Sequence, residues 1–421
     1  QNILKKLNKK LFINKIILNK IISFKDKNMK KINKIDLILK NYEEKQKIKK
    51  NININTLNYK FKYNLDNQNI RLCKKCILPS TFPSITFNEK GICSICLNFV
   101  REKISSKKIT TLIKKKDKIL VPISGGRDSC YTLHYLSKQF NNSLIAYTYD
   151  WGFITDIARE NISNMCGELG IEHILIAADI KQKRKFVRMN LLAWLKNINL
   201  GMLPLLMAGD KFFFDYAQTL KKEHHCSKIF FSHHKYEKTF FKSGFIGSNN
   251  YYGNNKKIYA LNLADKLNAL FGYSKEFLFN SSYINSSLIE TVKAYFSFYI
   301  NKNYHDYYSI FDYQDYDENK IIKTLIKKYN WSKGDNNTSW RIGDMITPFS
   351  NYCYYVIAGF NEHHTFRSNQ IRDNKISRNE ALNLVKYDNA KYEKSFINFC
   401  KVINVDVNFI LDKINNAKKL Y

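Results

Sequence analysis

The segment Ser124–Ser129, which reads Ser-Gly-Gly-Arg-Asp-Ser, has the residue types and spacing of a phosphate-binding loop. It directly follows the apolar run 118–123 and precedes a stretch with helical periodicity, so it is expected between a strand and a helix. Two consecutive glycines let backbone N–H groups gather around anionic oxygens, and the start of a helix adds partial positive charge. Asp128 would repel a phosphate directly, so we expect it to meet one through Mg²⁺.

Four cysteines have the spacing of a metal site. Cys73 and Cys76 form one Cys-x2-Cys pair, and Cys93 and Cys96 form a second pair after sixteen intervening residues. Two such turns can direct four thiolates at one zinc ion, which would hold structure and not activate water. Two disulfides, four free thiols or an iron–sulfur cluster are the alternatives. The remaining five cysteines show no pairing pattern and are expected to be small buried apolar residues.

Arginine is scarce in this chain, with ten among the 69 basic residues, so the grouping of Arg341, Arg367 and Arg372 is informative. A guanidinium can bind phosphate through two parallel hydrogen bonds, which suits the phosphates of a nucleotide sugar. Surface ion pairs are the alternative. The stretch 245–330 is rich in Tyr, Phe, Asn and Ser, and its rings suit either stacking on a sugar or a plain helical core.

The elements that must position these residues alternate along the chain. Apolar runs predict strands at 118–123, 144–149, 172–177 and 228–232, and the intervening periodicity predicts helices at 155–169, 179–195 and 207–223. This alternation predicts an α/β fold with a doubly wound parallel sheet. Ligands of such sheets bind at the carboxyl ends of the strands. The candidate motifs are therefore Ser124–Ser129, Asp150–Phe153 and His233–Glu237.

The sequence divides into four predicted regions. Residues 1–70 form a basic Lys/Asn-rich extension, and 71–108 form the four-cysteine knuckle. Residues 109–250 carry the strand and helix alternation, and 251–421 form a mostly helical region expected to bind substrate. The extension is expected to be solvated, or alternatively an amphipathic helix at a membrane surface.

The formal net charge of +33 at first suggests a nucleic-acid partner. The abundance of Lys, Asn, Ile, Tyr and Phe, however, is typical of AT-rich codons, and residues 1–72 alone carry a net +14. We therefore expect no nucleic-acid partner. No apolar run reaches the length of a membrane span, and no secretory signal pattern is present, so the sequence predicts a cytoplasmic location.

Longer stretches extend the pattern of the glycine loop. They lie at 73–83, 91–96, 150–156, 158–162, 201–204, 207–211, 237–244 and 377–382. Together with the loop, they resemble the N-acetyl sugar amidotransferases of bacterial surface-polysaccharide synthesis, within the PP-loop ATP pyrophosphatase superfamily. The resemblance covers roughly residues 71–390. The extension 1–70 has no counterpart in it, and Arg127 stands where the superfamily often has Lys.

The resemblance implies an ATP-dependent enzyme that converts a sugar acetamido group to an acetamidino group and releases AMP and pyrophosphate. It implies ATP and Mg²⁺ as cofactors beside structural Zn²⁺, and an N-acetylated nucleotide sugar as substrate, as in lipopolysaccharide synthesis. The implied pyrophosphate-binding residues are Ser124, Gly125, Gly126, Arg127 and Ser129. Asp128 and Glu237 would bind Mg²⁺. Tyr149 and Asp150 would lie near the adenosine, and Asp210 and Lys211 would line the sugar or phosphate pocket.

Some alternatives remain open in the sequence. Asp210 and Lys211 also fit an ordinary helix start, and His233 and His234 fit either a proton-transfer role or strand-end polar positions. No cysteine lies in a Gly-x-Cys-x-Gly elbow, so ammonia is expected either free or from a separate glutaminase subunit. A tRNA-modifying PP-loop enzyme, such as a thiolase or lysidine synthetase, is the main alternative function. A non-catalytic zinc-ribbon interaction protein is the other.

Overall fold

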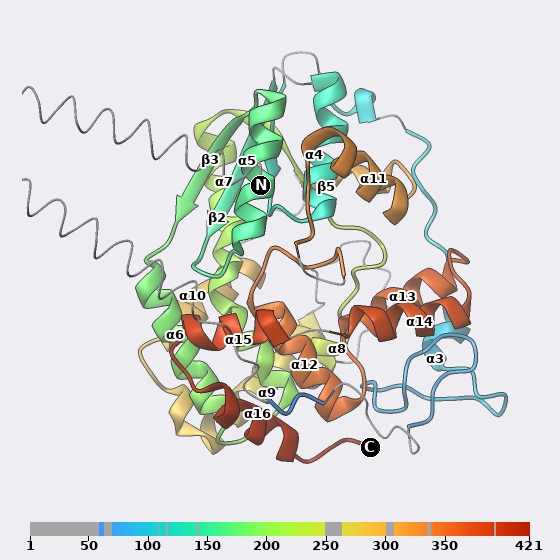
Figure 1. The fold of residues 1–421 in the computed structure, drawn as a ribbon, viewed down its shortest axis with the longest axis vertical. Coiled ribbons are helices and arrows are strands. Elements are labelled where there is room, and N and C mark those ends of the chain that lie inside the picture. Colours follow the sequence, from blue (N-terminus) through green and yellow to red (C-terminus); the bar gives the residue numbers. More distant parts are fainter. Residues whose placement is uncertain are drawn as a thin grey trace, which may run out of the picture. The chain divides into compact units, whose positions relative to one another are not determined.

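The structure, a computed structural model, describes residues 59–62, 70–107, 109–114, 117–140, 143–248, 263–299, 307–334, 338–390 and 393–421. The chain divides into two compact units, Gln1–Tyr59 and Lys60–Tyr421, and the fold described below is that of the second. Most of the predicted extension 1–70 lies outside the described residues. In Figure 1 the strands occupy the upper part of the second unit, and most helices of the C-terminal region lie below them, whereas α11 (Glu318–Tyr329) lies near α4 (Arg127–Phe140) in the upper part.

A five-stranded, all-parallel sheet forms the centre of the fold. Its strands are β1 (Lys118–Pro122), β2 (Leu144–Asp150), β3 (Glu172–Ala177), β4 (Cys226–Phe231) and β5 (Tyr307–Ser309). They lie in the order β3-β2-β1-β4-β5, and every neighbouring pair is parallel. After β1 the chain adds β2 and β3 on one side of β1, and it then returns to add β4 and β5 on the other side. This reversal places the segments after β1 and β4 next to each other at the carboxyl edge.

The predicted α/β class and parallel sheet are confirmed, and four of the five strands coincide with apolar runs in the sequence. The fifth strand, β5, was not predicted. It belongs to the region 251–421 by sequence, yet it pairs with β4 through Ile229 and Tyr307. The sheet therefore continues across the predicted boundary at residue 250.

Helices cover both faces of the sheet, as the alternation of side chains along the strands shows. Ala146 and Phe230 belong to the apolar core formed with α4 (Arg127–Phe140) and α5 (Asp156–Leu169). The next residue along β2, Tyr147, points the other way and stacks on Phe213 at the start of α7, with ring centroids 5.4 Å apart. Successive side chains of a strand point to opposite faces, so α4 and α5 cover one face and α7 covers the other.

The remaining helices follow in chain order. They are α3 (Ser94–Leu97), α6 (Ile180–Trp194), α7 (Phe212–Glu223), α8 (Phe241–Gly244), α9 (Leu263–Phe279), α10 (Leu288–Tyr299), α11 (Glu318–Tyr329), α12 (Ile346–Ala358), α13 (Glu362–Arg372), α14 (Arg378–Asp388), α15 (Glu393–Val402) and α16 (Val407–Asn416). The C-terminal region is thus mostly helical, as predicted. No helix among the described residues is both long and apolar enough to cross a bilayer.

One predicted helix differs from the structure at its start. The periodicity predicts a helix over 207–223, but the α-helix begins at Phe212. The preceding segment, η4 (Leu200–Lys211), is 3-10 helix with Pro204 inside it and a non-helical backbone at Met207. Proline lacks the N–H that an α-helical turn requires, so this segment is held by tighter turns.

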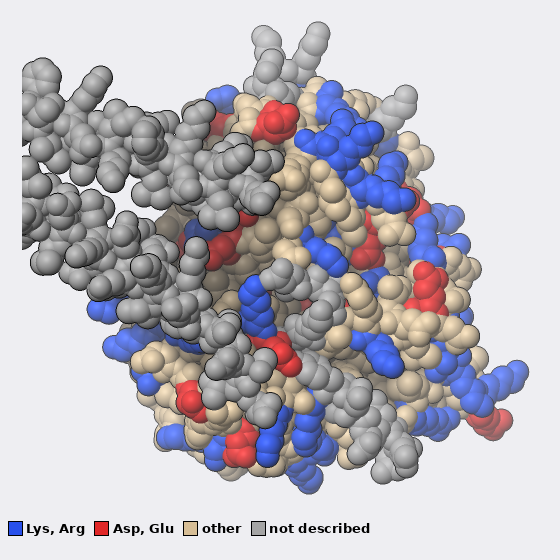
Figure 2. Space-filling view, viewed as in Figure 1, with Lys and Arg blue, Asp and Glu red and all other residues tan. Residues whose placement is uncertain are grey.

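Described basic side chains are spread over much of the face drawn in Figure 2. On the face drawn in Figure 2, the described Lys and Arg residues lie among neutral and acidic ones and form no continuous band. Nucleic-acid binding domains usually gather basic side chains on one face or along one groove.

Candidate functional site

The glycine loop joins β1 to α4 and is closed by one serine. Ser129 Oγ accepts from the backbone N of Ser124 at 3.1 Å and donates to the carbonyl of Gly126 at 3.0 Å. It also lies 3.1 Å from Ser124 Oγ. Ser124 is exposed, whereas Ser129 is buried. The structure therefore brings the loop residues together in one tight turn at the start of a helix.

Gly125 occupies a position that only glycine can fill. Its φ is +74°, and a Cβ at this position would lie 2.3 Å from the carbonyl oxygen of Ala158 in α5. Its own carbonyl accepts hydrogen bonds from Asn161 Nδ2 and Trp331 Nε1, each at 3.0 Å. The loop is thus fixed by α5 and by the segment after α11, and its shape does not depend on a ligand.

Three metal-ligating side chains meet beside the loop: Asp128, His234 and Glu237. One ligand atom from each lies within 4.8 Å of the others. His234 Nε2 is 3.5 Å from Asp128 Oδ2 and 3.9 Å from Glu237 Oε1. That imidazole nitrogen is buried and has no hydrogen-bond partner among the described residues. Two carboxylates and one imidazole suit a divalent cation, so these residues could hold one.

Aromatic side chains orient the two carboxylates. Tyr316 donates its hydroxyl hydrogen to Asp128 Oδ1 at 2.9 Å, and Trp340 Nε1 donates to Glu237 Oε1 at 2.8 Å. The ring of Tyr316 also stacks on His234, with centroids 4.0 Å apart. Partners of this kind fix the direction of a ligand oxygen before a metal arrives.

Arg127 points away from the loop and into a buried ion network. Its Nε lies 3.1 Å from Asp128 Oδ1, and its Nη1 pairs with Glu318, which also pairs with Arg367. Its Nη2 is buried and has no hydrogen-bond partner among the described residues, although Arg127 contributes to the cavity wall. The sequence predicted that Arg127 contacts pyrophosphate; in the structure its Nε and Nη1 donate to Asp128, Glu318 and Ser339.

This network keeps the carboxylates ionised. Burial alone would raise the pKa of Asp128, but the charge of Arg127, with a hydrogen bond from Tyr316, outweighs it and holds that pKa below its usual range. Burial likewise opposes ionisation of Glu318, and Arg127 and Arg367 overcome it and lower its pKa to about 2. Asp128 therefore carries the negative charge that a metal ligand requires.

A cavity of 440 Å³ opens beside these groups, a volume typical of small-molecule sites. Its wall includes Ser124, Asp128 and Glu237, and it also includes Lys242, Arg341 and Glu362, which are called the second wall below. Glu362 pairs with Lys242, and its Oε2 lies 3.3 Å from Arg341 Nε.

Glu362 is fully buried, and its two cationic partners stabilise its ionised carboxylate. Burial opposes its ionisation, but Lys242 and Arg341 lower its pKa to about 2. Both cationic side chains remain partly exposed at the cavity. This second wall can therefore present positive charge to an anionic ligand.

Some of the other predicted site residues line the cavity, and one does not. Tyr149, Asp210 and Lys211 line the cavity, and Lys211 Nζ pairs with Asp210 Oδ1 at 3.0 Å. Asp150 is buried; its carboxylate pairs with Arg159 and accepts from Gly152 N at 2.9 Å. It does not contribute to the cavity wall.

Of the three C-terminal arginines predicted to bind substrate phosphate, the structure brings only Arg341 to the cavity wall. Arg367 is buried between Glu318 and Asp388, at 2.8 and 2.9 Å. Arg372 lies beside the cysteine cluster, with its Nη1 3.7 Å from Cys96 Sγ. These two side chains hold helices and the cysteine cluster in place.

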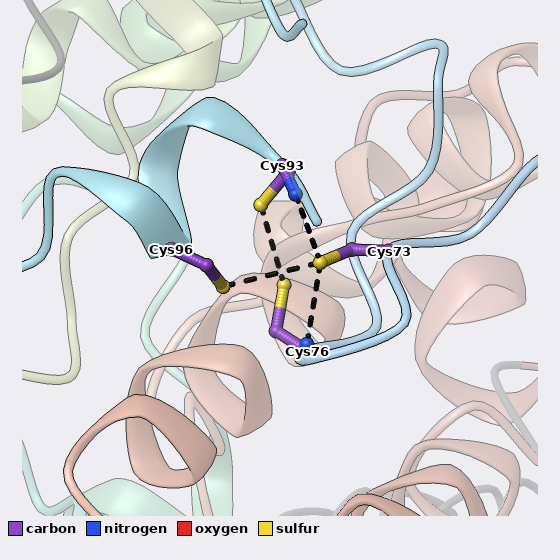
Figure 3. A group of neighbouring side chains, drawn as sticks. All are labelled: Cys73, Cys76, Cys93 and Cys96. Atoms are coloured by element: carbon purple, nitrogen blue, oxygen red, sulfur yellow. Dashed lines mark hydrogen bonds between the residues drawn. The ribbon is translucent and has the colours of Figure 1, made fainter. Parts of the chain in front are cut away.

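The four predicted cysteines converge in one buried cluster, shown in Figure 3. Cys73 Sγ and Cys96 Sγ are 4.0 Å apart, and Cys76 Sγ and Cys93 Sγ are 3.8 Å apart. A tetrahedral zinc site with Zn–S bonds of about 2.3 Å has sulfur atoms about 3.8 Å apart. These spacings exceed the S–S bond length of about 2.0 Å, which excludes the disulfide alternative in this structure. The cluster could hold a zinc ion.

The knuckle that carries these cysteines is attached to two C-terminal helices (Figure 1). Arg378 at the start of α14 donates through Nε to the carbonyls of Cys73 and Cys76, at 3.3 and 3.0 Å. Arg372 at the end of α13 approaches Cys96 Sγ. Backbone N–H groups of Cys93 and Cys76 point at Cys73 Sγ, at 3.2 and 3.4 Å, which suits a thiolate ligand.

Sequence reasoning missed His234 as a member of the metal cluster. The available signal was its place just after a predicted strand, three residues before Glu237, where both side chains can reach the carboxyl edge. It also missed Tyr316, Trp340 and Lys242, which no local pattern distinguishes from ordinary core or surface residues. Their roles follow only from contacts between distant parts of the chain.

Comparison with known proteins gives no assignment. No model of a known protein family matches the chain, and no curated protein matches it significantly.

Proposed function

We propose that this chain is an ATP-dependent ligase that works through an adenylated intermediate. The observation that carries the proposal is the position of Asp128, His234 and Glu237 beside a closed glycine loop, where the strand order reverses and a cavity opens. An ATP-dependent ligase requires a divalent cation, a binding site for the phosphate oxygens and space for a second substrate. This site offers residues suited to all three.

The resemblance to PP-loop enzymes suggests the roles of these residues. Backbone groups of the loop and the hydroxyl of Ser124 would receive the pyrophosphate that leaves ATP. Mg²⁺ would be held by Asp128, Glu237 and His234, and when bound it would neutralise part of the negative charge on the phosphates. The oriented partners Tyr316 and Trp340 keep both carboxylates aimed at the ion without rearrangement during the reaction.

For the second substrate, the resemblance to N-acetyl sugar amidotransferases favours a sugar acetamido group. Its carbonyl oxygen attacks the α-phosphorus of ATP, and the bond from that phosphorus to the pyrophosphate oxygen breaks. The amide oxygen, now carried on AMP, becomes a good leaving group. Ammonia then adds to the carbon, AMP departs with the oxygen, and an acetamidino group remains. The protein's contribution is to hold the reactants in line and to stabilise phosphate charge.

The second wall of the cavity suits the anionic end of this substrate. Lys242 and Arg341 face the cavity and are anchored from behind by the buried Glu362. We propose that they bind the phosphates of a nucleotide sugar. Lys242→Met should then raise the KM for the sugar substrate by at least about tenfold, because a charge-assisted hydrogen bond is lost, and should leave the KM for ATP nearly unchanged.

Ammonia is the third reactant. We propose that a separate glutaminase subunit supplies it, and that free ammonium replaces that subunit in the assay below.

The test is to supply purified protein with ATP, Mg²⁺, ammonium and a panel of N-acetylated nucleotide sugars. Pyrophosphate release and the oxygen-to-NH mass change of the sugar are followed together. Ser129→Ala should lower turnover by at least about 100-fold, because it removes the hydroxyl that closes the loop. Ser137→Ala, a serine of the same helix outside the loop, is the matched control.

Two results would refute parts of the proposal. Unchanged ATP turnover in Ser129→Ala would refute the assignment of the loop. Pyrophosphate that appears only when tRNA is added would replace the sugar substrate by a tRNA substrate and leave the ATP site standing.

A further inference from the structure

The consecutive helices α9 and α10, called the α9–α10 hairpin below, expose an unusual number of large apolar side chains. The outer side of α9 is apolar, with Phe271, Leu278 and Phe279 exposed at 74%, 86% and 75%. Its inner side is mixed: Asp265 and Ala269 are buried, Tyr273 lines the cavity and Phe277 packs on Tyr283. A surface helix normally buries its apolar side and exposes its polar side. Here several of the large apolar side chains of α9 face away from the protein.

The second helix also exposes apolar side chains. Ile289, Val292 and Phe296 of α10 are exposed, whereas Thr291, Ala294 and Phe298 are buried. Of the twenty exposed large hydrophobic residues among the described parts of the chain, ten lie between Leu263 and Phe296. Exposed large apolar side chains are thus concentrated in this one segment of the described chain. Concentrated apolar surface of this kind marks interaction sites.

The rest of the protein holds polar side chains on the inner side of the hairpin. Glu276 of α9 accepts from Asn199 Nδ2 at 2.8 Å, and Glu290 of α10 pairs with Lys183 Nζ at 2.8 Å. Asp265 Oδ1 accepts from Ser248 at 3.0 Å. These partners fix which side of each helix faces inward. The outward direction of the apolar side chains is therefore built into the fold.

The acidic and basic residues of the hairpin lie on different sides. Its three acidic residues are Asp265, Glu276 and Glu290, and all three are bonded to the body of the protein. Lys275 and Lys293 are exposed beside the apolar residues. The outer surface of the hairpin is therefore apolar and cationic, while its negative charge is turned inward.

We propose that the outer surface of the α9–α10 hairpin docks the protein on an anionic phospholipid membrane. Exposed Leu and Phe next to Lys are the elements of interfacial binding, in which apolar side chains enter the headgroup boundary and lysines meet anionic lipids. The chain carries a net charge of +33, which opposes pairing of two copies and favours a negative surface.

The proposal is tested by co-sedimentation of the full chain with vesicles of phosphatidylcholine and phosphatidylserine. Phe271→Ser/Leu278→Ser should lower the apparent affinity at least about tenfold, because two exposed apolar side chains no longer enter the bilayer. Lys275→Glu/Lys293→Glu should weaken binding to these vesicles and leave any binding to pure phosphatidylcholine vesicles unchanged. Because all four side chains are exposed, thermal unfolding of the variants should match the parent protein.

The matched control is Ile326→Ser/Leu382→Ser, which removes two exposed apolar side chains of α11 and α14. It should bind vesicles like the parent protein. Equal binding of all variants would place the contact elsewhere in the chain and overturn the proposal, as would the absence of any vesicle binding. The proposal is also overturned if sedimentation velocity shows a dimer that Phe271→Ser/Leu278→Ser converts to a monomer, because the surface would then join two copies.

Discussion

Glu318 provides the sharpest test of the buried ion network behind the loop. Its carboxylate pairs with both Arg127 and Arg367, and Arg367 also pairs with Asp388. Removing its charge by Glu318→Gln leaves two buried guanidinium groups with one carboxylate fewer. Uncompensated buried charge is strongly destabilising, so the free energy of unfolding should fall by about 3 kcal/mol at pH 7.

The pKa of Glu318 gives the same magnitude by an independent route. Burial opposes its ionisation, but the two arginines lower its pKa from 4.5 to about 2. That difference corresponds to about 3 kcal/mol in favour of the folded state when the group is ionised. Because the folded pKa is depressed, this stabilisation is complete above the unfolded pKa of 4.5 and is lost as the pH falls toward 2. By linkage the loss is about 0.8 kcal/mol at pH 4 and about 2 kcal/mol at pH 3.

The assay is chemical denaturation of the parent protein and Glu318→Gln at pH 7, 5, 4 and 3. The stability difference between them should shrink as the pH falls, because only the parent protein loses the contribution of an ionised Glu318. Glu160→Gln, a change at an exposed glutamate of α5, is the control and should alter stability by less than about 0.5 kcal/mol. A difference below about 1 kcal/mol at pH 7, or one that does not change with pH, would refute this account of the network.

Three further predictions concern the loop, the metal cluster and the cysteines. Gly125→Ala should destabilise the protein by about 3 kcal/mol or more in denaturant titration, because the new Cβ would clash with the Ala158 carbonyl at a residue with positive φ. The control is Gly167→Ala, where an added Cβ would have no neighbouring atom within 4 Å; its stability should be unchanged or slightly higher. Asp128→Asn should raise the Mg²⁺ concentration needed for half-maximal pyrophosphate release by at least about tenfold, since even outer partners of a metal cost that much when removed. Cys96→Ser should lower the zinc content measured by mass spectrometry below one ion per chain and lower the Tm, and an unchanged zinc content would exclude Cys96 as a ligand.

The parts of the fold that sequence could predict are those specified by local patterns. Strands β1 to β4 are apolar runs of ordinary length, and the glycine loop is a contiguous segment. The four cysteines have a spacing that few other structures require. Each of these signals lies within about 25 residues, so no knowledge of the tertiary structure was needed.

The parts that sequence could not predict depend on contacts between distant segments. Tyr316 donates to Asp128 across 188 positions, and Glu318 meets Arg127 across 191 positions. No periodicity in either segment encodes these pairs. The strand β5 has three residues, Tyr-Tyr-Ser, and forms only because β4 offers it an edge. Arg341, Arg367 and Arg372 were predicted to act together, but only Arg341 lines the cavity, because the fold pairs Arg367 with Glu318 and Asp388 and directs Arg372 to the cysteine cluster.

The helix α13 ties the cysteine cluster to the wall of the cavity. Glu362 at its first turn anchors Lys242 and Arg341, and Arg372 at its last turn approaches Cys96 Sγ. Its eleven residues span about 16 Å as one rod. A rigid rod moves at both ends when one end is displaced, so we expect loss of a metal from the knuckle to shift Lys242 and Arg341 as well. A chelator should therefore alter the KM for the sugar substrate at a lower concentration than it needs to unfold the chain. The cysteine cluster would then support the geometry of the cavity as well as the fold of the knuckle.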